Sequence, residues 1–239
     1  MPCENLPQWL QYIDSLHVKK IDMGLARVRE VAEKLAVLQP GKCNIIVAGT
    51  NGKGSTAVFT EALARAQGMT VGTTLSPHVQ AFNERVRLAG EPVSDALLCE
   101  CFAAVESARG AIALTYFEFA TLVALFAFKQ AEVDLAILEV GLGGRLDAFN
   151  IVDADLAIVT SIGLDHEEFL GNDIEQIGRE KAGVFRPGQK VVVGCVTGSV
   201  VEQARALNCD VLQLGVDFTV QETSDAWSVS GQNDGWGEL

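Results

Sequence analysis

The sequence predicts an α/β fold in which a mostly parallel sheet is flanked by helices and carries a phosphate-binding loop. The first observation is the succession of a strand, a glycine-rich loop, a helix and a second strand over residues 44–75. Such a βαβ unit joins two parallel strands. The second observation is a pair of near-continuous apolar runs at residues 133–140 and 155–160, which is typical of parallel strands covered on both faces.

The first half of the chain supplies the elements that lead into this unit. Apolar residues at helical spacing predict helices over residues 6–16 and 23–38, and Pro40 with Gly41 ends the second of them. After the loop, a helix is expected over residues 56–67, followed by a strand at 70–75. Residues 85–93 alternate around Gly90, which indicates a hairpin.

The second half continues the alternation of helices and strands. Helical spacing predicts helices over residues 94–108, 116–129, 173–182 and 199–207, and short apolar runs predict strands at residues 190–193 and 210–214. Beyond Gly215 the chain is polar and alternates weakly up to residue 239. We therefore expect a small antiparallel edge near the C-terminus.

Composition limits the classes of partner. The 239 residues include 31 Asp plus Glu but only 18 Lys plus Arg, which gives a formal charge of −13. A chain this acidic repels polyanions unless it has a basic patch, and none is visible. We expect no nucleic-acid partner and no anionic membrane partner.

Cysteine usage and hydropathy indicate where the chain works. The six cysteines contain no CxxC pair and are expected to be buried hydrophobes or free thiols rather than a metal or disulfide framework. The N-terminus lacks the pattern of a signal peptide. The most apolar segment, residues 119–128, is about half a membrane span. A cytoplasmic protein is the expectation.

The segment GTNGKGS at residues 49–55 is the strongest chemical signal. A glycine-rich turn between a strand and a helix directs backbone N–H groups at an anion, and the helix dipole favours the same charge. Lys53 adds a cation for the outer phosphates. The strict GxxxxGK[ST] pattern is not met, because Val47 replaces the first glycine and Gly54 precedes Ser55. The alternative is a plain glycine turn, but the position directly after a buried strand favours phosphate binding.

Three polar residues follow strands that should end at the same edge of the sheet. Glu139 ends an apolar strand, Ser76 follows another in SPH, and His166 closes GLDH after a third. Ligands bind at the carboxyl ends of strands in a doubly wound sheet, and a carboxylate beside a phosphate loop commonly serves magnesium. The alternatives are a salt-bridged strand terminus for Glu139, a turn for Ser76 and an ordinary histidine for His166.

Two charged residues on predicted helices are harder to interpret. Lys181, taken from the sequence alone, is an exposed helix lysine. Glu118 interrupts an apolar helix. A carboxylate in such a place is either paired with a buried cation or faces a polar ligand.

Several motifs in this order resemble the N-terminal ATPase domain of the folylpolyglutamate synthase family, a branch of the wider Mur ligase group. They are GTNGKGS, SPH at residues 76–78, EVGLGGRLD at 139–147 and EKAG at 180–183. TYFE at residues 115–118 and KIDMG at 20–24 are similar to the bacterial bifunctional type, dihydrofolate synthase/folylpolyglutamate synthase. The resemblance implies an ATP-dependent ligase that phosphorylates the carboxylate of dihydropteroate or a folate. The amine of L-glutamate then attacks the acyl phosphate.

The resemblance also implies roles for individual residues. Lys53, Glu139, His166 and Lys181 would be catalytic. The ATP phosphates would be held by Thr50, Asn51, Gly52, Lys53, Gly54 and Ser55. Two Mg²⁺ sites are implied, one at Ser76 and Glu139 and a second at His166, with Lys181 as a carbamate that bridges to the second. The pteroate pocket would be lined by Asp22, Met23, Gly24, Thr115, Tyr116, Phe117, Glu118, Leu146, Asp147 and Ala148, with Glu118 and Asp147 as polar contacts for the pterin ring.

This chain departs from the family in two residues and in length. Leu75 stands where Ser or Thr usually precedes SPH, and Phe149 stands where Thr usually follows Asp-Ala. We expect residues 1–239 to be a truncated, monomeric N-terminal domain without the C-terminal glutamate-binding domain, so ligation by this chain alone is doubtful. Another Mur-type ligase and a nucleotide-binding fragment without catalysis remain as alternatives.

Overall fold

The computed structural model describes residues 3–16, 22, 24–165, 167–222 and 227–231. Its centre is a sheet in the order β4-β3-β2-β5-β1-β6-β7-β8, which has eight strands within those ranges. The strands are β1 Cys43–Ala48, β2 Val71–Thr74, β3 Val86–Leu88, β4 Glu91–Pro92, β5 Leu135–Glu139, β6 Leu156–Ser161, β7 Lys190–Cys195 and β8 Asp210–Gln213. Neighbouring strands from β2 onward in this sheet order, which are β2, β5, β1, β6, β7 and β8, pair in parallel. The predicted α/β fold with a mostly parallel sheet is therefore confirmed.

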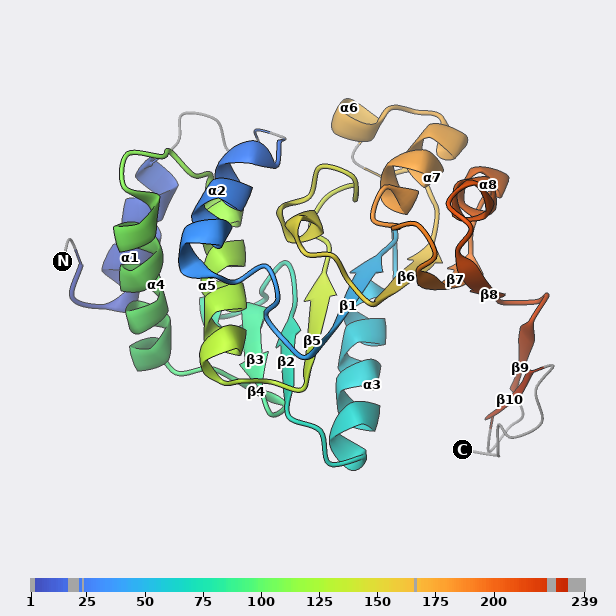
Figure 1. The fold of residues 1–239 in the computed structure, drawn as a ribbon, viewed down its shortest axis with the longest axis horizontal. Coiled ribbons are helices and arrows are strands. Elements are labelled where there is room, and N and C mark those ends of the chain that lie inside the picture. The colour runs from blue at the N-terminus through green and yellow to red at the C-terminus, as the bar shows by residue number, and fades with distance from the viewer. Residues whose placement is uncertain (1–2, 17–21, 23, 166, 223–226, 232–239) are drawn as a thin grey trace.

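Antiparallel pairing is confined to two places among the described residues. The hairpin of β3 and β4 adds to β2 at one edge of the sheet, as the alternation around Gly90 predicts. Near the C-terminus, β9 Phe218–Glu222 and β10 Trp227–Gly231 form a separate two-stranded sheet. Figure 1 shows this pair extending away from the main sheet. The expected small antiparallel element is therefore present.

The helices cover the two faces of the sheet unequally. The alternation of side chains along a strand sends Ile46 and Leu138 into a large core shared with most of the helices, and Ile45 and Ile137 into a smaller core with α3. The helices are α1 Leu6–Ser15, α2 Ala26–Leu35, α3 Lys53–Ala66, α4 Asp95–Arg109, α5 Tyr116–Gln130, α6 Glu167–Leu170, α7 Ile174–Ala182 and α8 Gly198–Ala206, with 3-10 turns η1 Phe82–Arg85 and η2 Ala148–Ile151. Figure 1 shows α1, α2, α4 and α5 grouped at one end and α7 with α8 beside β7 and β8.

Helix α3 begins earlier than the sequence predicts. Its N-cap is Gly52, whose φ of 83° is in the left-handed region that glycine adopts without strain. Lys53, Gly54 and Ser55 therefore form the first helical turn, where the expectation was a loop up to residue 55. The correction matters because it places the backbone N–H groups of these residues at a helix N-terminus.

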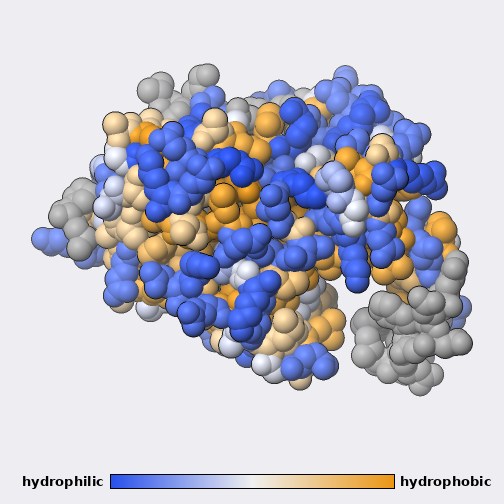
Figure 2. Space-filling model, in the orientation of Figure 1, coloured by the Kyte–Doolittle hydropathy of each residue, from blue (hydrophilic) through white to orange (hydrophobic). Residues whose placement is uncertain are grey.

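The surface and the cysteines agree with a globular chain. Figure 2 shows hydrophilic side chains across the visible face with hydrophobic ones among them, including where α3 lies, and Phe59 and Leu63 of that helix are exposed. All six cysteines are free. Within the described part of the chain, no helix combines the length and apolarity needed to cross a membrane.

Candidate functional site

The phosphate-loop segment lies between β1 and α3 and is fixed to the end of β6. The Thr50 amide donates to the Ser161 carbonyl at 2.7 Å, and the Thr160 hydroxyl donates to the Asn51 carbonyl at 2.7 Å. A Cβ on Gly49 would lie 2.0 Å from Thr160 Oγ1, and Gly49 has a φ of 145°. No side chain of the described residues caps α3. The loop is thus held rigid while the helix N-terminus is left open to an anion.

Two lysines converge on this loop. Lys53 Nζ donates to the carbonyls of Gly49 and Thr50 at 3.0 Å each, and Lys181 Nζ donates to the same Gly49 carbonyl at 3.0 Å. Burial, with a smaller contribution from the charge of Lys53, lowers the pKa of Lys181 to about 8. Lys181 is only 3% exposed, so its interpretation as an exposed helix lysine is wrong.

The burial of Lys181 follows from close backbone contacts of α7. A Cβ on Gly144 would lie 2.7 Å from the Glu180 carbonyl oxygen and 2.8 Å from that of Lys181. The Arg145 amide donates to the Glu180 carbonyl at 2.9 Å. The loop after β5 therefore lies directly on the last turn of α7 and holds Lys181 under the phosphate loop.

This contact predicts that Gly144→Ala disturbs both stability and the loop. The added methyl must displace backbone atoms of α7, so we expect a loss of about 1–3 kcal/mol in the free energy of unfolding, measured by urea titration. Gly198→Ala is the matched control, because a Cβ there meets no atom within 4 Å. Equal stability of the two variants would contradict the packing of Gly144 on α7.

Glu139 and Ser76 lie beside the first turn of α3. The Ser76 amide donates to Glu139 Oε2 at 2.6 Å, and a Cβ on Gly54 would lie 3.5 Å from Glu139 Oε1. Burial raises the pKa of Glu139, and the Ser76 amide and the charge of Lys53 oppose that shift. A groove of about 540 Å³ runs along this surface and is lined by Gly52, Gly54, Ser55, Val58, Phe59, Leu75, Ser76, Pro77 and Glu139. Oxygen donors next to a phosphate loop fit Mg²⁺, which keeps waters and binds through few carboxylates.

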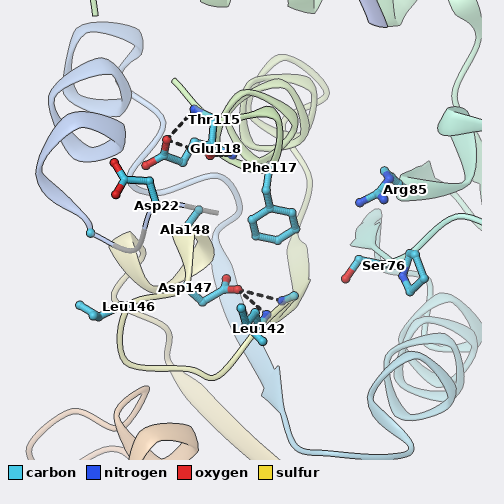
Figure 3. Close-up of a pocket in the computed structure, with 13 residues that line it drawn as sticks. Asp22, Ser76, Arg85, Thr115, Phe117, Glu118, Leu142, Leu146, Asp147 and Ala148 are labelled. Carbon is cyan, nitrogen blue, oxygen red and sulfur yellow. Dashed lines mark hydrogen bonds between the residues drawn. The ribbon is translucent and has the colours of Figure 1, made fainter. Parts of the chain in front are cut away.

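A second cavity, of about 340 Å³, opens between α5, the loop after β5 and the segment before α2 (Figure 3). Residues expected from the resemblance line it, namely Asp22, Gly24, Thr115, Phe117, Glu118, Leu146, Asp147 and Ala148. Ser76 and Pro77 line both this cavity and the groove. Tyr116 is not in the cavity lining, while Met23 and His166 lie outside the described residues.

Glu118 provides acidic character at one end of the cavity. Its Oε2 accepts from the Thr115 amide at 2.8 Å and from Arg27 Nε at 2.9 Å, and Arg27 Nη1 also pairs with Asp22 Oδ2 at 2.7 Å. Glu118 Oε1 is buried and has no hydrogen-bond partner among the described residues. Glu118 is therefore paired with the cation of Arg27, and its Oε1 remains as a hydrogen-bond acceptor without a donor.

Asp147 is occupied by backbone groups. Its Oδ2 accepts from the amides of Gly141 at 2.9 Å and Leu142 at 3.0 Å (Figure 3), and its Oδ1 accepts from the amide of Phe149 at 2.9 Å. Burial raises the pKa of this carboxyl to about 6, although the three amides act in the opposite direction. The carboxylate thus organises the loop between β5 and η2.

Arg85 is a pocket residue that the sequence analysis missed. Its Nε donates to His78 Nδ1 at 2.7 Å, and its guanidinium carbon lies 6.0 Å from the ring centres of both Phe82 and Tyr116. Burial lowers its pKa, and no carboxylate of the described chain forms an ion pair with it. The predicted hairpin could have indicated the position of Arg85, because a strand antiparallel to β2 brings residue 85 back beside Leu75. Figure 3 shows Arg85 across the cavity from Glu118.

Comparison with protein families matches residues 47–217 to the Mur ligase middle domain. The chain belongs to the Mur ligase family. A curated relative, dihydrofolate synthase/folylpolyglutamate synthase of Escherichia coli K12, is 48% identical over 227 residues, which are 94% of this chain and 54% of the relative. The chain therefore spans about half the length of the curated relatives it matches.

Solved structures of similar sequence share this fold. E. coli FolC in complex with DHPP and ADP superposes with a TM-score of 0.94 at 47% identity, over 97% of this chain and 56% of that one. A bifunctional folylpolyglutamate synthase/dihydrofolate synthase with Mn, AMPPNP and L-glutamate bound gives a TM-score of 0.91 at 46% identity, over 100% of this chain and 57% of that one.

Proposed function

We propose that this chain is the nucleotide-binding and acid-binding part of an ATP-dependent ligase that adds L-glutamate to dihydropteroate and to folates. The observation that carries the proposal is the junction at Ser76 and Pro77, where the 340 Å³ cavity meets the groove along the phosphate loop. An acid held in the cavity could present its carboxylate to a phosphoryl group there. The relatives at 48% and 46% identity are dihydrofolate synthase/folylpolyglutamate synthases.

The distribution of charge in the cavity supports one orientation of the acid. Glu118, with its free oxygen, is at the end where an N–H edge of a pterin ring would find an acceptor. Arg85 lies across the cavity and forms no ion pair with a carboxylate of the described chain, so it suits the benzoate carboxylate. Phe117 lies between the two and offers a ring face to an aromatic ligand.

The phosphate loop supports the role of ATP. In the proposal the open N-terminus of α3 and residues Thr50 to Ser55 bind the phosphates, and Lys53 exchanges its carbonyl contacts for the outer phosphate. Glu139 and Ser76 would hold Mg²⁺, which neutralises charge on the transferred phosphoryl group. We assign His166 and a carbamylated Lys181 to a second metal. The lowered pKa of Lys181 supports this, because carbamylation requires the neutral amine.

The proposed reaction has two steps. The carboxylate oxygen attacks the γ-phosphorus, the bond to ADP breaks, and an acyl phosphate forms. The neutral amine of glutamate then attacks the acyl carbon, and phosphate leaves as the amine loses a proton. Since the relatives are about twice as long, the proposal gives this chain the phosphate and acid sites and places the glutamate site in the remaining half. We further propose a monomeric cytoplasmic protein.

Calorimetric titration of dihydropteroate into the chain with MgATP present tests the proposal. We expect a micromolar Kd that rises about 10–100-fold in Arg85→Met, because a charge-assisted pair is lost. A pterin without the benzoate carboxylate should bind both proteins equally. Arg179→Met, which removes an exposed arginine on α7, should bind dihydropteroate like the wild type. Binding of ATP without binding of dihydropteroate would refute the ligase assignment and leave a nucleotide-binding module.

A further inference from the structure

The ring of Phe117 lies between the 340 Å³ cavity, called the main cavity below, and a smaller cavity behind it. Ser76, Arg85 and Phe117 line both. The smaller cavity is also lined by Leu75 and Phe149, the two residues in which this chain departs from the motifs described above. The position of one aromatic ring therefore sets the shape of the main cavity on this side.

That ring is held by contacts on two sides. A Cβ on Gly141 would lie 2.4 Å from Phe117 Cζ, so the ring end rests on the backbone of residue 141. Phe149 meets the same ring edge-on, with centroids 5.8 Å apart and planes at 84°. This is a favourable geometry for an aromatic pair.

Both contacts depend on the same carboxylate. Asp147 accepts the amide of Gly141 through Oδ2 and the amide of Phe149 through Oδ1, each at 2.9 Å. Phe149 is 4% exposed and belongs to the turn η2, so its ring has little freedom to move away. Asp147, Gly141 and Phe149 together form a support that fixes Phe117.

We infer that Phe149 is a positioning residue for binding of the aromatic acid, and that it acts through the ring of Phe117. The inference rests on the proposed function and deepens it. The flat ring of the ligand lies against Phe117, and Phe149 holds Phe117 where it leaves room for that ring. Phe149 itself lies behind Phe117 and does not line the main cavity. Its side chain affects affinity for the acid and leaves the nucleotide site unchanged.

A double-mutant cycle on the full 239-residue chain tests this inference. Phe149→Leu keeps an apolar side chain but removes the ring edge, and it should raise the Kd of dihydropteroate about three- to tenfold. The Kd of MgATP should stay within about twofold. In a Phe117→Leu background the same substitution should have almost no further effect on dihydropteroate binding. Phe128→Leu, a fully buried position on α5 outside the cavities, is the control for lost core packing.

The outcomes are distinguishable. Equal Kd values of the wild type and Phe149→Leu would overturn the inference and leave the proposed function intact. So would additive effects of Phe117→Leu and Phe149→Leu, or the same loss in Phe128→Leu. If wild-type protein binds ATP but no dihydropteroate, the proposed function fails and the inference fails with it.

Discussion

Asp147→Ala should abolish measurable binding of dihydropteroate, with a loss of about 100-fold or more. The substitution leaves the amides of Gly141, Leu142 and Phe149 without their acceptor. Only the bond to the Phe149 amide is fully buried, and a buried donor left unpaired costs about 1–3 kcal/mol. The segment that carries Leu146 and Ala148 then loses its geometry, and Phe117 loses its support. Calorimetry gives the affinity, and urea titration should show a destabilisation of about 2 kcal/mol.

The control for this prediction is a carboxylate that makes no contact with the cavity. Asp173→Ala removes the N-cap of α7, whose side chain accepts from the Glu175 amide. It should lower stability by about 1 kcal/mol and leave the Kd of dihydropteroate unchanged. If Asp147→Ala binds the ligand within threefold of wild type, the carboxylate does not organise the cavity.

The carboxyl group of Asp147 also makes the free energy of unfolding depend on pH, and its raised pKa determines the direction of that dependence. The pKa of Asp147 rises from 3.8 to about 6 on folding, so between these values the folded state binds more protons than the unfolded state. Stability from this group is therefore fully present below about pH 4 and is lost as pH rises through 6, with a maximum change of about 3 kcal/mol. Urea titrations from pH 4 to pH 7 should show this decline in wild type and a flatter profile in Asp147→Ala.

The order of polar residues along the sheet edge could be predicted from sequence because it depends on local signals. A glycine loop after an apolar strand and a carboxylate at the end of another need only the rule that parallel strands end at one edge. The register brings Val47 opposite Glu139 and Val159 opposite Ala48, which aligns the ends of β1, β5 and β6. The helix start at Lys53 was missed because it depends on the left-handed Gly52.

Contacts between segments far apart in the sequence could not be predicted from local sequence patterns. The burial of Lys181 requires Gly144 to lie against α7, and no local pattern around residue 181 carries that information. Arg27 reaches Glu118 across 91 positions, and it was never a candidate. Asp147 lines the cavity, as the resemblance implies, but the backbone amides that its oxygens accept could not be predicted. Such roles depend on tertiary geometry, which spacing in the sequence does not encode.

Lys181→Met should stabilise the fold and weaken the binding of MgATP. The lowered pKa of Lys181 means that its buried ammonium group disfavours the folded state, and methionine fills similar space without charge. We expect the free energy of unfolding at pH 7 to rise by about 1–3 kcal/mol, while the Kd of MgATP rises about tenfold or more because the proposed ligand of the second metal is lost. Lys129→Met, at an exposed position of α5, should change neither quantity.

Whether Lys181→Met raises or lowers the stability distinguishes a role of Lys181 at the nucleotide site from a structural role. The Gly49 carbonyl keeps Lys53 as a donor after the substitution, so the variant leaves no buried acceptor unpaired. A gain in stability together with weaker MgATP binding would mean that the lysine is retained for the nucleotide site at a cost to the fold. A loss of more than about 1 kcal/mol would instead make the bond from Lys181 to Gly49 a structural tie between α7 and the loop, and an unchanged Kd for MgATP would remove Lys181 from the proposed site.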